Sequence, residues 1–216
     1  MEMVIDYLAK WGHFLAGITW IGLLYYFNFV QGEYFKEADA AARTDAFIKL
    51  VPRALWWFRW AAMFTFLTGL IMLYFRGITV SVDLVVGSVM AILMFLNVWL
   101  IIWPNQKILI ASNEQIAGGG EALPEAAAAA PKAALASRTN VLFSISMLYF
   151  MGSTSANLSS GIMTNEVNAL IAALVVIAAI EINAIVGKPG PIASVRGVIV
   201  SGFVLFVVLW GLLQIL

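Results

Sequence analysis

The chain has 216 residues, of which 62% are hydrophobic and only 11% are charged, and its mean hydropathy is +0.95. This composition lies outside the range of soluble domains and predicts an integral membrane protein embedded in a lipid bilayer. The 12 basic and 12 acidic residues cancel, so we expect no nucleic-acid partner. The lack of cysteine excludes disulfides, iron–sulfur clusters, thiolate metal sites and covalent c-type haem within these residues.

Six apolar segments are long enough to cross a bilayer. They cover residues 7–31, 54–75, 84–103, 141–161, 167–187 and 195–216. A helix of about 20 residues spans the roughly 30 Å hydrocarbon core, and continuous rather than alternating apolar runs favour helices. We therefore predict an all-α bundle of six transmembrane helices that forms a single domain over residues 1–216.

Basic residues fall on alternate connections between these segments. Lys10 and Arg76 lie on one side of the predicted membrane, and the other ten of the twelve basic residues lie on the opposite side. Loops rich in lysine and arginine stay in the cytoplasm. We therefore predict a multi-pass protein of the bacterial inner membrane with both termini in the periplasm.

Two cytoplasmic connections have distinct compositions. Residues 34–50 combine helix-forming residues with apolar side chains spaced among charges, which predicts a short helix lying at the membrane interface. Residues 117–134 contain three consecutive glycines, two prolines and five consecutive alanines, which predicts a mobile loop with at most one helical turn.

His13, the one histidine of the sequence, lies one to two turns inside the first predicted span. An ionisable group at this depth favours a function, either proton transfer or the ligation of a metal or haem. Met151 on the fourth span reaches a similar depth, so the two residues are candidate axial ligands of a b-type haem held between helices. The structural alternative is a buried imidazole bonded to a threonine, serine or carbonyl of a neighbouring span, with Met151 as a packing residue.

Polar and aromatic side chains gather at the predicted cytoplasmic ends of four spans. The set comprises Asn28, Gln31, Arg53, Trp56, Trp57, Arg59, Trp60, Trp103, Pro104, Asn105, Gln106, Lys107, Arg138, Thr139 and Asn140. Arginine donors, amide groups and tryptophan faces together favour a site for a planar, anionic molecule rich in hydrogen-bonding groups. An interfacial aromatic belt with snorkelling cations is the alternative interpretation, but it leaves amides such as Asn28 and Gln106 unexplained.

Two further polar residues lie within the predicted spans. Asn97 on the third span is typical of the polar groups that hold transmembrane helices together. Glu181 on the fifth span either pairs with one of the cytoplasmic-side arginines or is protonated, and we favour the ion pair because no second acidic residue lies within the spans. The sequence contains no Walker loop, HExxH motif, paired carboxylates or histidine cluster, which argues against hydrolytic and metal-oxygenase chemistry.

Four stretches carry a family resemblance: HFLAGITWIGLLYYFNFVQ, VPRALWWFRWAAMFTFLTGL, NVWLIIWPNQK and ASRTNVLFSISMLYFM. From residue 11 to residue 155 the chain resembles the membrane domain of the bacterial urate hydroxylase, or membrane urate oxidase, family. The resemblance implies oxidation of urate to 5-hydroxyisourate, with electrons leaving to a c-type cytochrome. That family commonly carries the cytochrome as a periplasmic domain. Because these residues include no CxxCH motif, we expect a separate cytochrome c as the electron acceptor.

The resemblance also implies site residues. The family's motif positions are occupied by His13, Arg53, Trp57, Arg59, Asn97, Asn105, Gln106, Arg138 and Asn140. We take His13 as the catalytic proton carrier or haem ligand, and the others as candidate substrate-binding residues. The alternative is a catalytically silent accessory subunit of a larger respiratory or photosynthetic membrane complex, which the lone histidine and the missing cytochrome motif favour. A small-solute transporter is less favoured, because no span is visibly broken in both halves.

Overall fold

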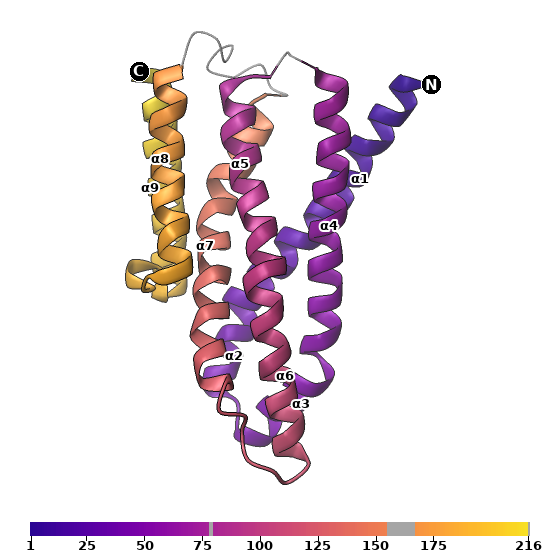
Figure 1. Ribbon diagram of the computed structural model, residues 1–216, viewed down its shortest axis with the longest axis vertical. Coiled ribbons are helices and arrows are strands. Elements are labelled where there is room, and N and C mark those ends of the chain that lie inside the picture. The colour runs from indigo at the N-terminus through magenta and orange to yellow at the C-terminus, as the bar shows by residue number, and fades with distance from the viewer. Residues whose placement is uncertain (78–79, 155–166, 216) are drawn as a thin grey trace.

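The computed structural model describes residues 1–77, 80–154 and 167–215, and the regular elements in these ranges are helices. Long helices run side by side along one axis (Figure 1). Five helical runs have the length and apolar composition to cross a membrane: Glu2–Glu37, Val51–Arg76, Val82–Ala117, Val167–Val186 and Val195–Ile215. The prediction of an all-α fold is therefore confirmed, and five of the six predicted spans correspond to helices that are long and apolar enough for a multi-pass membrane protein.

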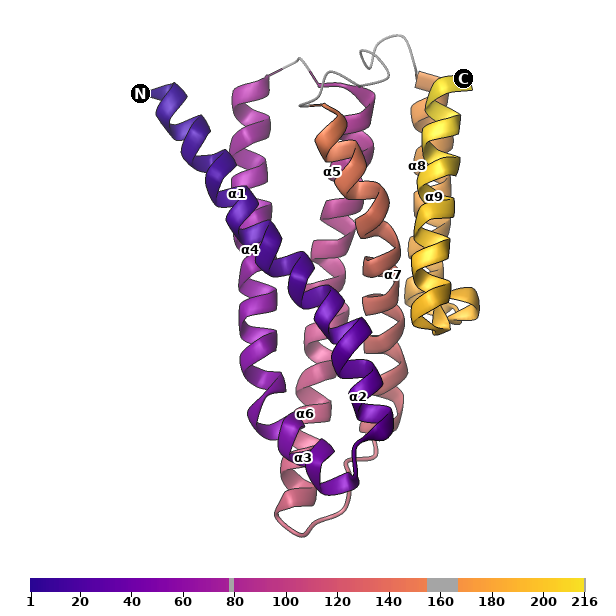
Figure 2. The ribbon, with the colours of Figure 1, turned by 180° about the vertical axis from the view of Figure 1, so that it is seen from behind.

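The first part of the chain forms a helical hairpin. Its elements are α1 (Glu2–Tyr25), the π-helical segment η1 (Tyr26–Gln31), α2 (Gly32–Glu37), α3 (Ala40–Lys49) and α4 (Val51–Arg76). Because α1, η1 and α2 are continuous, they form one long run, which crosses diagonally over α4 (Figure 2). The short helix predicted over residues 34–50 is present as α3, but its predicted bounds are wrong. Residues 34–37 belong to α2, and α3 begins after a break, where the Asp39 carboxylate accepts a hydrogen bond of 2.7 Å from the Ala42 amide.

The rest of the chain adds a second long run, a single helix and a second hairpin. The elements are α5 (Val82–Leu96), the π-helical segment η2 (Asn97–Ile102), α6 (Trp103–Ala117), α7 (Ala126–Ser153), α8 (Val167–Val186), the 3-10 helix η3 (Gly190–Ala193) and α9 (Val195–Ile215). Both chain ends lie at one end of the bundle, here named the terminal end, while α3 and the connection from α6 to α7 lie at the opposite end, the α3 end (Figure 1). This placement of the termini agrees with an even number of passes.

Helix α7 runs between α5 and the α8–α9 hairpin, and it is buried by its neighbours (Figure 1). It contains most of the fourth predicted span, although residues 155–161 of that span lie outside the described residues. Its composition does not place it among the five apolar runs, and fourteen of its 28 residues are buried, several of them serine, threonine or asparagine. A helix surrounded by protein can carry such polar groups because its neighbours supply hydrogen bonds.

The predicted mobile loop over residues 117–134 is also wrong in its extent. Helix α6 continues to Ala117 and α7 begins at Ala126, so residues 118–125 alone separate the two helices. Alanine has the highest helix propensity, and Ala129 and Ala133 are buried against neighbouring elements. Pro131 lies in the second turn, where it costs a single backbone hydrogen bond near the helix start.

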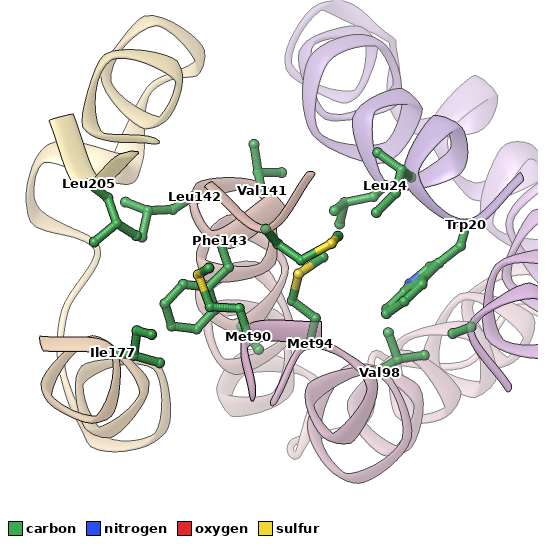
Figure 3. Packing of buried hydrophobic residues seen from close by; sticks show 14 of the residues in the cluster. Trp20, Leu24, Met90, Met94, Val98, Val141, Leu142, Phe143, Ile177 and Leu205 are labelled. Atoms are coloured by element: carbon green, nitrogen blue, oxygen red, sulfur yellow. The ribbon is translucent and has the colours of Figure 1, made fainter. Parts of the chain in front are cut away.

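The core lies where α1, α5 and α7 meet (Figure 3). Trp20 of α1 points toward Val98, and Met90 and Phe143 lie against each other between α5 and α7 (Figure 3). On the other side of α7, Leu205 of α9 faces Leu142, which attaches the α8–α9 hairpin to the bundle. The packed interior thus extends through the whole set of helices.

Candidate functional site

Two π-helical segments interrupt the long runs and carry buried amide side chains. The segment η1 contains buried Asn28 and Gln31, and η2 begins with buried Asn97. Single turns of π-helix inside α-helices occur frequently at functional sites. Pro104, two residues after η2, is a sequence signal for a local change in helical geometry, whereas η1 has no comparable signal.

Arg59 joins α4 to α6 through an aromatic ring. Its guanidinium carbon lies 3.6 Å from the centre of the Trp103 ring, which is a close cation–π contact. The Nη1 atom of Arg59 is buried and has no hydrogen-bond partner among the described residues. The ring therefore holds the guanidinium in place but leaves one of its donor nitrogens unused.

The segment η1 is fixed beside α7, close to a second half-buried arginine. The Asn28 amide nitrogen donates to the Leu24 carbonyl at 2.9 Å and to the Ser137 hydroxyl at 2.8 Å. The next residues on α7 are Arg138 and Thr139, whose Nη1 and Oγ1 atoms are buried without a partner in the described ranges. Glu33 is near enough to interact electrostatically with the Arg138 guanidinium.

Three more polar atoms at this level are buried without a partner in the part of the chain that the structure describes. They are the amide oxygens of Gln31 and Gln106 and the indole nitrogen of Trp99. Gln106 lies one turn after Trp103 on α6, and the ring of Trp99 lies 5.7 Å from that of Trp60, measured between centroids. Helix α7 packs against both η2 and α6, and α4 packs against α6.

We name these six residues the polar cluster: Gln31, Arg59, Trp99, Gln106, Arg138 and Thr139. Buried polar atoms in folded proteins nearly always have hydrogen-bond partners, and each one left without a partner costs about 1–3 kcal/mol. Most of the buried side-chain atoms found without a partner in the described ranges belong to this cluster. The six residues come from η1, α4, η2, α6 and α7.

The predicted substrate residues fall into three groups. Arg59, Gln106 and Arg138 belong to the polar cluster. Arg53 and Trp57 are exposed and, with Pro52 and Trp56, line a shallow hollow on the outer surface. Asn105 donates to the Ile101 carbonyl of its own helical run at 2.7 Å, while Asn97 and Asn140 bond to each other. The sequence did not single out Trp99, because its burial depends on packing between helices.

Glu181 is bonded to an amide. The Asn97 Nδ2 atom donates to the Asn140 Oδ1 atom at 3.0 Å and to the Glu181 Oε2 atom at 3.1 Å, and the Asn140 amide donates to the Met94 carbonyl at 2.9 Å. The expected ion pair with an inner arginine is therefore wrong. Helix α8 packs against α5 and α7, so that Asn97 on the adjoining η2 meets the Glu181 carboxyl group.

His13 is bonded to a threonine of a neighbouring helix, as the structural alternative predicts. Its Nδ1 atom lies 3.2 Å from the Thr68 hydroxyl oxygen on α4, and that hydroxyl donates to the Phe64 carbonyl at 2.6 Å. The ring also packs on Gly69, where a Cβ atom would lie 3.3 Å from His13 Cε1.

His13 and Met151 do not fit a haem held between them. His13 packs on α4, whereas the Met151 side chain lies against Gly87 of α5, where a Cβ atom would be 3.3 Å from Met151 Cγ. Within the described ranges, the structure brings together no group of three or more histidine, aspartate or glutamate residues that could hold a metal ion. His13 and Met151 therefore do not form a pair of axial haem ligands.

Comparison with known proteins leaves the site to be interpreted from its own contacts. No family model, curated protein or solved structure matches this chain. The polar cluster combines two positively charged side chains with buried hydrogen-bonding atoms that have no partner in the described ranges.

Proposed function

We propose that the chain is a urate hydroxylase-like membrane oxidoreductase domain, which binds a planar purine anion in the polar cluster and passes electrons to a separate c-type cytochrome. The observation that carries the proposal is a pair of half-buried arginines, Arg59 and Arg138, each with a buried Nη1 atom that has no partner in the described ranges. Neither forms a salt bridge in the described part of the chain. Positive groups whose buried donor atoms lack a partner favour an anionic ligand.

The hydrogen-bonding atoms of the cluster complement urate. Urate is a planar anion with ring N–H donors and carbonyl acceptors. Unpartnered donors come from Arg59, Arg138 and Trp99, and unpartnered acceptors are the amide oxygens of Gln31 and Gln106. A site with several buried hydrogen-bonding groups also discriminates against analogues that cannot satisfy them.

The reaction that the resemblance implies is a two-electron oxidation. Urate and one water molecule give 5-hydroxyisourate, two protons and two electrons, and the cytochrome accepts the electrons. In this proposal the arginines hold the anion, and the amide oxygens of Gln31 and Gln106 fix the orientation of its ring. His13 lies about 25 Å along the first helical run from Gln31, so it is not part of the binding site proposed here.

The first test is urate binding by the full chain purified in mild detergent, measured by isothermal titration calorimetry. We expect Arg59→Gln to weaken urate binding by about tenfold or more, because a charged hydrogen bond is lost. Arg53→Gln is the matched control, since Arg53 lies on the same helix but is exposed. Circular dichroism and size-exclusion chromatography would establish that each variant is folded.

The outcomes separate the proposed function from its alternative. Urate-dependent reduction of added oxidised cytochrome c by the wild-type chain would support an oxidoreductase. A folded wild-type chain that binds no urate and copurifies in fixed stoichiometry with other membrane subunits would refute the proposal and favour an accessory subunit. Equal urate affinity in wild type and Arg59→Gln would remove the polar cluster from the binding site.

A further inference from the structure

Glu181 is an acidic residue on the buried face of α8, whose opposite face is exposed. It is 9% exposed, whereas its neighbours on α8, Ile182 and Ile185, are 60% and 59% exposed. An ionisable group inside an apolar helix is costly and is kept where it has a partner and a use. The function proposed above does not use Glu181. Its hydrogen-bond partner, Asn97, lies on η2, which also carries Trp99 of the polar cluster.

The hydrogen bonds of Glu181 reach three neighbouring elements. Both hydrogens of the Asn97 amide are used, one by Glu181 of α8 and the other by Asn140 of α7. Asn140 in turn donates to the carbonyl of Met94, in the last turn of α5 just before η2 begins. The network therefore links Asn97, the first residue of η2, to α7 through Asn140 and to α8 through Glu181.

The same network involves α7 and η2, two of the elements that carry residues of the polar cluster. Asn140 follows Arg138 and Thr139 directly on α7, and Asn97 precedes Trp99 by two residues on η2. A change in the register of η2 or in the rotation of α7 would move these cluster side chains together. Positioned groups lose binding energy when displaced by as little as about 1 Å.

We propose that Glu181 is a positioning residue for the polar cluster: through Asn97 and Asn140 it fixes the geometry of η2 and α7, which makes the α8–α9 hairpin part of the binding machinery. The inference rests on the proposed function as far as the identity of the ligand is concerned. The positioning itself depends on the Glu181 oxygen as a hydrogen-bond acceptor, a property that glutamine retains.

The test compares three variants of the full chain. Glu181→Ala removes the acceptor, and Glu181→Gln keeps an acceptor oxygen. Ile177→Ala is the control, because Ile177 is buried one turn earlier on the same side of α8 and packs in the core without joining the network. Two measurements are made on each: hydrogen–deuterium exchange of residues 97–102 without urate, and urate affinity by calorimetry.

We expect Glu181→Ala to raise amide exchange across η2 and to weaken urate binding about tenfold, which is the effect of about one lost hydrogen bond. We expect Glu181→Gln to keep both values near those of the wild type. We expect Ile177→Ala to change urate affinity less than about twofold, because Ile177 makes no hydrogen bond in the network and acts independently of the binding site. Unchanged exchange and affinity in Glu181→Ala would overturn the inference. So would a Glu181→Gln variant as impaired as Glu181→Ala, or an Ile177→Ala variant equally impaired in binding.

A failure of the proposed function gives a different result. If the wild-type chain binds no urate but Glu181→Ala still loosens η2 while Glu181→Gln does not, the positioning role stands and urate is the wrong ligand. If no variant changes exchange in η2, the positioning role fails whether or not urate binds.

Discussion

Arg59 lies on the face of Trp103, with its guanidinium carbon 3.6 Å from the ring centre, and its buried Nη1 atom has no hydrogen-bond partner in the described ranges. The ring restricts the side chain without using its donors. Preorganised donors of this kind bind an anion with little further loss of side-chain entropy. The pair is therefore the most direct place to test whether the polar cluster is a binding site.

Replacing the ring should weaken anion binding while the charge stays in place. We expect Trp103→Leu to reduce urate affinity about fivefold, since a desolvated cation–π contact contributes about 1–2 kcal/mol. Lys107→Gln is the control, because the Lys107 Nζ atom lies 5.6 Å from the same ring centre and the residue is exposed. Calorimetry on both variants decides the question, and equal affinities for the two would argue that Trp103 serves only packing.

Glu33 should compete with an anionic ligand for Arg138. Its carboxylate interacts electrostatically with Arg138 and also accepts hydrogen bonds of 2.8 and 3.0 Å from Lys36. We expect Glu33→Gln to raise urate affinity about two- to threefold, because removing one negative charge near a partly screened site changes the binding free energy by less than about 1 kcal/mol. Glu37→Gln, at the exposed end of α2, is the matched control. A fall in affinity for Glu33→Gln would contradict this account.

His13 should contribute to stability through Thr68. We expect His13→Ala and Thr68→Val each to lower the free energy of unfolding by about 1 kcal/mol, and the double variant to lose little more, because both remove the same hydrogen bond. Thermal unfolding in detergent measures the loss, and urate affinity should stay unchanged. Loss of urate turnover in a fully stable His13→Ala protein would instead assign His13 a catalytic role.

The attachment of the α8–α9 hairpin should depend on Gly202. A Cβ atom there would lie 2.5 Å from Ile145 Cδ1 and 3.3 Å from the Leu142 carbonyl oxygen of α7. We expect Gly202→Val to destabilise the protein by about 1–3 kcal/mol, as overpacking does. Gly211→Val is the control on the same helix, because a Cβ atom at Gly211 meets nothing within 4 Å in the described part of the chain. Equal thermal stability of the two variants would show that α9 is not packed this closely.

Hydropathy predicted the helical class and most of the long helices, because length and apolar composition are local properties of the chain. It also placed Arg59, Gln106 and Arg138 at one end of the bundle, since basic residues fall on alternate connections. The partner of Glu181 was mispredicted because a hydrogen bond between residues 84 positions apart depends on helix packing. The π-helical geometry of η1 leaves the hydropathy pattern unchanged, so the residues of Tyr26–Gln31 gave no basis for predicting a π-helix.

The path of the chain predicts which side of the membrane each connection faces. Glu2 lies at the terminal end of the bundle, and Glu121 lies in the connection between α6 and α7 at the α3 end (Figure 1). The sequence contains no cysteine, so Glu2→Cys and Glu121→Cys each introduce a single thiol without background. We expect a membrane-impermeant maleimide to label Glu2→Cys in intact spheroplasts and Glu121→Cys only after the membrane is opened, because basic connections stay in the cytoplasm. Labelling of Glu121→Cys but not of Glu2→Cys in intact spheroplasts would place α3 and the basic connections in the periplasm, and it would contradict the orientation that the charge distribution predicts.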